Sequence, residues 1–142
     1  MDAASPPALL ETTLTRAADM LGDVTPAVMT RFYARWPEAR ATFEALSPGR
    51  REVLEGEMIE RVLYCLMQWH DYPGEIEIML FGSVPHHAQT LNVPAEWYGG
   101  LLAMAMEVIG ETIPADRADE TGCWSDLRSD LAALVEQSSQ FI

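Results

Sequence analysis

The chain has 142 residues, 49% of them hydrophobic, which suits a single domain over residues 1–142 with one core. Its formal net charge is −13 and all nine basic residues are arginines, which excludes nucleic acid and anionic membranes as partners, because phosphate binding needs clustered Lys and Arg. No apolar run reaches the ~20 residues that span a bilayer, and residues 1–8 lack a secretory pattern, so we expect a soluble, cytoplasmic protein.

Two helices are predicted in the first third of the chain. The first runs from Ser5, a capping residue followed by proline, to Gly22, with apolar residues at helical spacing between them. The second starts at Thr25, which is again followed by proline, and its apolar stripe continues to Pro37. A short turn through residue 43 follows.

The middle of the chain predicts one long helix and one shorter helix. After a loop at residues 47–49, apolar residues recur about once per turn over residues 54–69, which is typical of a deeply buried helix. Residues 71–74 break the pattern. A second apolar segment over residues 76–84 stops at Pro85, because proline fits poorly inside a helix, and a new short helix is expected to begin there.

The last third predicts two more helices. A turn at residues 92–94 precedes a long apolar pattern over residues 97–109, and Pro114 restarts the chain. The final pattern runs from Trp124 to Phe141. No stretch alternates with a period of two, so the sequence predicts an all-α fold without strands.

The cysteines and two of the three histidines have plain structural interpretations. Cys65 and Cys123 each lie in an apolar helical context and are predicted to fill the core, with no disulfide or zinc site. His70, beside the end of the long helix, is predicted to cap it. His86 is expected to face solvent or to support its neighbour.

The third histidine, His87, is the candidate metal ligand. A neutral imidazole binds iron well when it faces an apolar slot wide enough for a flat macrocycle. The long helix opposite presents Met58, Val62 and Leu66, which supply such an apolar wall.

With these residues at these positions, the chain resembles the globin family over nearly its whole length. The stretch FYARWPEARATF resembles the end of the second globin helix and its corner, with Phe43 as the ring that packs against haem. Met58 stands at the distal position, Val62 one turn later over the haem, and His87 at the proximal position. Trp124, near the start of the last helix, resembles bacterial single-domain globins and the haem domains of flavohaemoglobins.

The segment after the proximal histidine extends the resemblance. In HAQTLNVPAEWYGGLL, four residues correspond to apolar haem contacts: Leu91, Val93, Tyr98 and Leu101. The resemblance implies a globin-like fold of roughly six to eight helices around haem b. It also implies reversible binding of a diatomic gas, with oxygen as the first candidate and nitric oxide and carbon monoxide as others.

The distal side departs from the common globin pattern. Met58 replaces the usual hydrogen-bonding residue. Such a hydrogen bond contributes about 1 kcal/mol, and somewhat more when charge develops on the ligand, so its loss is expected to speed oxygen release roughly tenfold. Three arrangements stay open: Arg61 turns toward the bound gas, Arg61 pairs with a haem propionate, or Met58 itself binds iron. Met29 stands where bacterial globins often carry tyrosine, so we expect no polar distal network, and Tyr33 is expected to pack.

Two other functions remain alternatives to gas binding. One is a haem-free globin fold that acts as a sensory or protein-interaction module, which the acidic surface favours. The other is an enzyme, with nitric oxide dioxygenation or pseudo-peroxidase chemistry on the haem. The chain carries no flavin or nicotinamide domain, so an enzyme would need an external reductase as partner. A homodimer partner is a further option.

Overall fold

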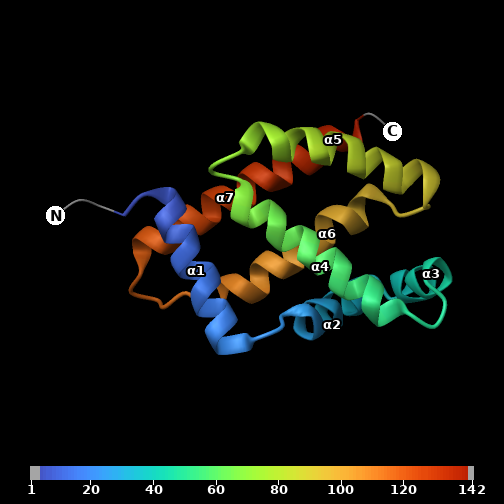
Figure 1. The fold of residues 1–142 in the computed structure, drawn as a ribbon, viewed down its shortest axis with the longest axis horizontal. Helices are drawn as coiled ribbons and strands as arrows, with labels where there is room; N and C mark the ends of the chain where they lie inside the picture. Colours follow the sequence, from blue (N-terminus) through green and yellow to red (C-terminus); the bar gives the residue numbers. More distant parts are fainter. Residues whose placement is uncertain (1–3, 141–142) are drawn as a thin grey trace.

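The structure, a computed structural model, describes residues 4–140 and contains within them seven α-helices and no β-strand (Figure 1). The prediction of an all-α chain is confirmed for this part of the protein. Phe141, which the last apolar pattern included, lies outside the described residues. The helices are α1 (Pro6–Leu21), α2 (Thr25–Arg35), α3 (Glu38–Leu46), α4 (Arg51–Gln68), α5 (Pro73–Thr90), α6 (Ala95–Gly110) and α7 (Ala118–Ser139).

The first two helices begin where the sequence predicts. The hydroxyl of Ser5 accepts the amide of Ala8 at 3.4 Å, which satisfies one of the unpaired donors at the start of α1. Gly22 ends this helix with a φ of 64°, a left-handed conformation that glycine adopts without strain. At the start of α2 it is the Asp23 carboxylate that accepts the Thr25 amide, at 2.9 Å.

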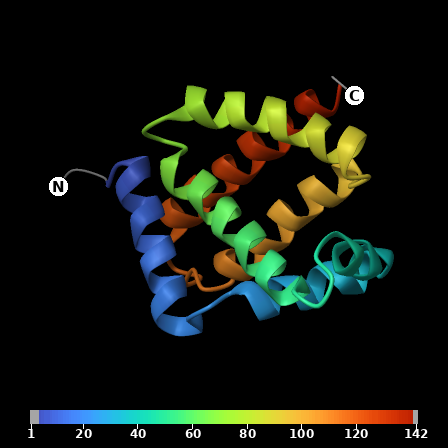
Figure 2. The same ribbon diagram turned by 45° about the vertical axis from the view of Figure 1, so that its right-hand side comes forward.

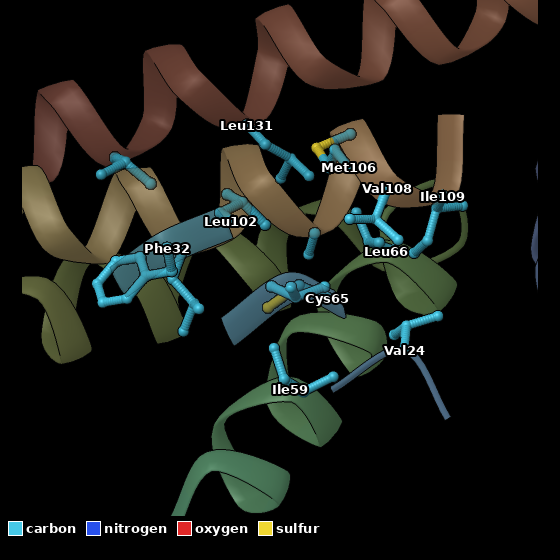
Figure 3. Close-up of a cluster of buried hydrophobic side chains, with 14 of the residues drawn as sticks. Val24, Phe32, Ile59, Cys65, Leu66, Leu102, Met106, Val108, Ile109 and Leu131 are labelled. Atoms are coloured by element: carbon cyan, nitrogen blue, oxygen red, sulfur yellow. The ribbon is translucent and has the colours of Figure 1, made fainter. Parts of the chain in front are cut away.

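Helix α6 lies at the centre of the bundle and contacts α1, α2, α4, α5 and α7. Figures 1 and 2 show α5 and α7 side by side along one edge, with α4 crossing in front of α6. Figure 3 shows Phe32 of α2, Leu66 of α4, Met106 of α6 and Leu131 of α7 converging in the core, and all four are at most 2% exposed. Each such side chain contributes about 1.5–3 kcal/mol by leaving water.

The predicted interruption at Pro85 is wrong. Helix α5 continues through this residue to Thr90, with the proline inside it. An internal proline withholds one backbone donor and costs about 3 kcal/mol. Three buried residues precede it, Ile76, Leu80 and Val84, and α5 packs extensively on α6 and α7. This packing outweighs the local cost, so the helix ends later than the sequence suggested.

The last helix begins at Ala118, six residues before Trp124, where the predicted pattern starts, and a buried carboxylate just inside it ties α7 to α1. The Glu120 side chain is 0% exposed. Its oxygens accept hydrogen bonds from Thr13 Oγ1 at 2.6 Å and from Arg16 Nη2 at 2.9 Å, and Arg16 Nη1 makes a second contact. Arg117 Nη2 lies 3.5 Å from Oε2. The sequence analysis did not single out Glu120 among the 22 acidic residues of the chain.

Two glycines inside helices are expected to respond oppositely to alanine. A Cβ on Gly100 would overlap the ring of Trp36, whereas one on Gly122 meets nothing within 4 Å. We expect Gly100→Ala to lower the free energy of unfolding by about 1–3 kcal/mol through overpacking. Gly122→Ala should raise it by about 0.5–1 kcal/mol through helix propensity. Urea unfolding followed by circular dichroism measures both, and equal effects would contradict the packing of α2 on α6.

The two cysteines differ in how far they are buried. Cys65 is buried in the core, as predicted. For Cys123 the prediction is wrong: it is half-buried and lies outside the core cluster, with its Sγ 3.7 Å from the Pro6 carbonyl oxygen; both thiols are free. Within residues 4–140, no helix combines the length and the apolar character needed to cross a membrane.

Candidate functional site

A cavity of about 380 Å³ lies between α4, α5 and α6, with α3 at one side. This volume falls within the ~300–1,000 Å³ typical of small-molecule sites. The lining includes all nine residues that the sequence analysis selected: Phe43, Met58, Arg61, Val62, His87, Leu91, Val93, Tyr98 and Leu101. Residues up to 58 positions apart in the chain, from 43 to 101, are thus brought to one space.

The wall formed by α4 comes from a single helix face. Met58, Arg61, Val62 and Cys65 all line the cavity, and their spacing of three or four residues puts them on one side of the helix. Met58 and Val62 are half-buried, and Arg61 is exposed at the edge, without a salt bridge to any residue in the described part of the chain. This wall is therefore mainly apolar, and the exposed side chains of Glu57 and Arg61 add one charge of each sign to the lining.

Cys65 belongs to the lining, although sequence reasoning assigned it only to the core. Burial raises the pKa of its thiol to about 11, so the group is neutral near pH 7. A neutral thiol is a weak metal ligand, and Cys65 acts here as a small apolar surface.

The opposite wall presents His87, whose ring is oriented by Ser83 one turn earlier on α5. His87 Nδ1 lies 2.7 Å from the Ser83 carbonyl oxygen and 3.3 Å from the Ser83 hydroxyl. A carbonyl only accepts, so Nδ1 donates its proton to it and Nε2 keeps its lone pair. Nε2 makes no hydrogen bond with residues 4–140. The imidazole is thereby held in the tautomer that a metal ion binds.

Tyr98 of α6 supports the same arrangement from the side. Its hydroxyl donates to Ser83 Oγ at 3.1 Å, and its ring meets the His87 ring edge-on with centroids 5.2 Å apart. Desolvation raises the pKa of Tyr98, so the phenol stays a neutral donor. Sequence reasoning missed Ser83; the signal available was its position four residues before His87 on the same helix face.

The turn after α5 fixes the backbone of the same histidine. The His87 carbonyl accepts the amides of Leu91 at 3.2 Å and of Val93 at 2.8 Å. Asn92 between them has a φ of 56°, which lets the chain reverse into α6. The backbone of His87 thus fixes the positions of Leu91 and Val93, which both line the cavity.

Phe43 is held rigidly at the α3 side of the cavity. Its buried ring stacks on Phe32 at 5.9 Å and meets Trp97 edge-on at 6.2 Å. Trp97 also lines the cavity, although the sequence placed it only in an apolar helix stripe.

Tyr33 packs as predicted and also donates a hydrogen bond to Glu55 at 2.5 Å. Burial and this carboxylate raise the pKa of Tyr33, so the phenol is a neutral donor in this contact.

The remaining histidines occupy different surroundings. His86 is exposed, lines the mouth of the cavity and lies 5.9 Å from the His87 ring, as a solvent-facing neighbour. His70 follows the end of α4, but its Nε2 is buried without a hydrogen-bond partner in residues 4–140, so this nitrogen does not cap the helix.

A bare metal centre has no support in the described part of the chain. No group of three or more His, Cys, Asp or Glu side chains gathers there to hold an ion. A single imidazole such as His87 therefore binds a metal only when the other ligands arrive with a cofactor. Comparison of the chain with protein-family profiles, with curated proteins and with solved structures gave no match.

Proposed function

We propose that the protein is a globin-like protein that holds haem b in the α4–α5–α6 cavity, with His87 as the axial iron ligand, and that it binds a diatomic gas reversibly. The observation that supports this most is the geometry of His87. Its Nδ1 is engaged by the Ser83 carbonyl at 2.7 Å, while the ring lines an apolar cavity with the distal and aromatic residues expected from the sequence.

The residues suit a haem group in three respects. The walls are mainly apolar, which favours burial of a macrocycle over hydration. The imidazole has a defined tautomer, and its supporting hydrogen bond is of the kind that metal-binding histidines use. Arg61 at the rim has no partner in the described residues and carries the planar fork that binds carboxylates, so it is available to a propionate.

Haem, when bound, would supply an iron that takes up a diatomic gas. Phe43, Met58 and Val62, which line the cavity, would pack against the group and exclude water from it. With Met58 at the distal place, a bound gas lacks the usual hydrogen bond, so fast release is expected. Two arrangements compete with the pairing of Arg61 and a propionate: Met58 binds the iron itself, or Arg61 donates a hydrogen bond to the bound gas.

Haem addition to the purified protein tests the proposal. We expect one equivalent of hemin to produce an intense Soret band and, after reduction, a spectral shift with carbon monoxide. Val62→Trp fills the cavity and should lower haem affinity at least about tenfold. Val53→Trp, on the exposed side of the same helix, is the matched control and should bind normally. Equal binding by the two variants would place haem elsewhere.

The haem-free sensory module is the second candidate, because the same cavity is lined mainly by apolar residues and suits any flat or extended apolar molecule. Failure of the protein to take up hemin, combined with displacement of a bound apolar fluorophore by Val62→Trp, would favour this candidate over gas binding.

A further inference from the structure

Helix α3 closes one side of the α4–α5–α6 cavity, although little of it is buried. Its residues Phe43 and Leu46 line the cavity, and Figures 1 and 2 show the helix at the edge of the bundle, beside α2 and the start of α4. Of its nine residues, only Ala39 and Phe43 are buried. A helix this short is marginal by itself. The position of Phe43 at the cavity therefore depends on the contacts that hold α3 in place.

Glu55 of α4 supplies a buried acceptor at this corner of the bundle. Its side chain is 10% exposed and does not line the cavity. Glu55 Oε2 accepts hydrogen bonds from the Tyr33 hydroxyl of α2, at 2.5 Å, and from Arg51 Nε, at 3.2 Å. A buried polar group is costly unless it is hydrogen-bonded, so these two donors hold the carboxyl group in one place.

Arg51 extends the network from Glu55 to α3. While its Nε donates to Glu55, its Nη1 donates to Glu44 Oε2 on α3 at 3.3 Å. The other oxygen of Glu44 accepts the amide of Gly49 at 2.9 Å, in the loop between α3 and α4. The rigid guanidinium fork of Arg51 thus bridges two helices and fixes the residue next to Phe43.

Tyr33 extends the network from Glu55 to Phe43 itself. The Tyr33 ring packs on the Phe43 ring with centroids 6.2 Å apart, and the hydroxyl of the same side chain is the group that Glu55 holds. Tyr33 does not line the cavity, so it supports Phe43 from outside the ligand space. Both branches start from one oxygen of Glu55 and end at adjacent residues of α3, Phe43 and Glu44.

We propose that Glu55 is a positioning residue for the α4–α5–α6 cavity. It clamps α3, and Phe43 with it, against the ligand space, and it thereby sets the rate at which a bound group leaves past α3. The inference rests on the proposed function for the identity of that group, haem. The contact between His87 and Ser83 lies within α5 and shares no residue with the clamp, so a change at Glu55 leaves it in place.

Hydrogen exchange of the ligand-free full chain, followed by mass spectrometry, tests the clamp. Glu55→Ala should speed amide exchange at least about tenfold in residues 38–49, because hydrogen bonds to a buried acceptor are lost. Exchange in α6 and α7 should stay within about twofold of wild type, because local opening leaves the core closed. Glu55→Gln keeps an oxygen that accepts the Tyr33 hydroxyl and should restore part of the protection.

An exposed acid on the same helix provides the matched control. Glu60→Ala removes the same group from the surface of α4 and should exchange like wild type. Faster exchange throughout the chain in Glu55→Ala would show that this residue serves overall stability alone. Unchanged exchange in residues 38–49 would show that it does not hold α3. Either result overturns the proposal.

Hemin loss tests the consequence for the site. Transfer of hemin to an excess of a haem-scavenging protein should be about tenfold faster or more in Glu55→Ala, with an unchanged Soret band before transfer. Tyr33→Phe, which keeps the ring, should also speed the loss. The double variant should lose hemin little faster than Glu55→Ala, because both changes remove one hydrogen bond. Equal rates in Glu55→Ala and Glu60→Ala would overturn the proposal. If the wild type takes up no hemin, the proposed function fails, and the exchange experiment still decides whether Glu55 clamps α3.

Discussion

Replacement of His87 by glycine is expected to remove the proposed iron ligand and, with it, the normal Soret band of the haem-loaded protein. The expectation follows from the structure around this ring, which lines the cavity: Nδ1 donates to the Ser83 carbonyl at 2.7 Å, so Nε2 keeps its lone pair for a metal ion. Absorption spectra of the ferric, ferrous and carbonmonoxy forms measure the effect.

Two controls make the His87 result specific. His86→Gly removes the adjacent, exposed imidazole and should keep the wild-type spectrum. Imidazole added to His87→Gly should restore it, because the vacated space accepts a free ligand of the same shape, and circular dichroism reports whether the variant is folded. An unchanged spectrum in His87→Gly would show that this residue is not the iron ligand, even if the protein binds haem.

Replacement of Glu120 by alanine is expected to be the most destabilising single change outside the core. Its carboxylate is 0% exposed and joins Thr13 and Arg16 of α1 to α7. Removal of one partner from a buried ionic network typically costs about 3–5 kcal/mol, because the remaining groups lose their compensation. Urea unfolding measures the loss.

A surface pair provides the matched control for Glu120. Glu111 also accepts two hydrogen bonds from an arginine, Arg31, but it is exposed. Exposed ion pairs contribute little to stability, so Glu111→Ala should change the unfolding midpoint only slightly. Similar losses in Glu111→Ala and Glu120→Ala would show that the Glu120 network does not hold α1 on α7.

The Glu120 network also predicts how stability depends on acid. The Arg16 hydrogen bond, followed by that from Thr13, lowers the pKa of Glu120 below its usual value of 4.5. Because the folded state favours the ionised form, this stabilisation is complete at neutral pH and is lost as the pH falls from about 4.5 through the lower folded value. Glu120→Gln should therefore flatten the stability profile in this acidic range, and a profile unchanged from wild type would contradict the lowered pKa.

Local sequence patterns predicted the helical class and part of the boundaries. Ser5 and Gly22 mark the ends of α1 correctly because capping and left-handed termination depend on neighbouring atoms alone. The nine candidate site residues were selected through a family resemblance, and they line one cavity. Ser83 was missed, although its spacing from His87 was visible, because nothing in the sequence alone says which backbone carbonyl a ring nitrogen reaches.

The remaining features were decided by tertiary packing. Local rules ended a helix at Pro85, but α5 continues because its buried face packs on α6 and α7, and long-range contacts outweigh one lost hydrogen bond. Glu120 was one acid among many until the approach of α1 buried it beside Arg16. The cavity between α4, α5 and α6 likewise depends on how far apart these helices settle, which no single helix encodes. The sequence by itself thus determined helices and their apolar faces, whereas cavities and buried charges exist only between elements and arise when those elements pack.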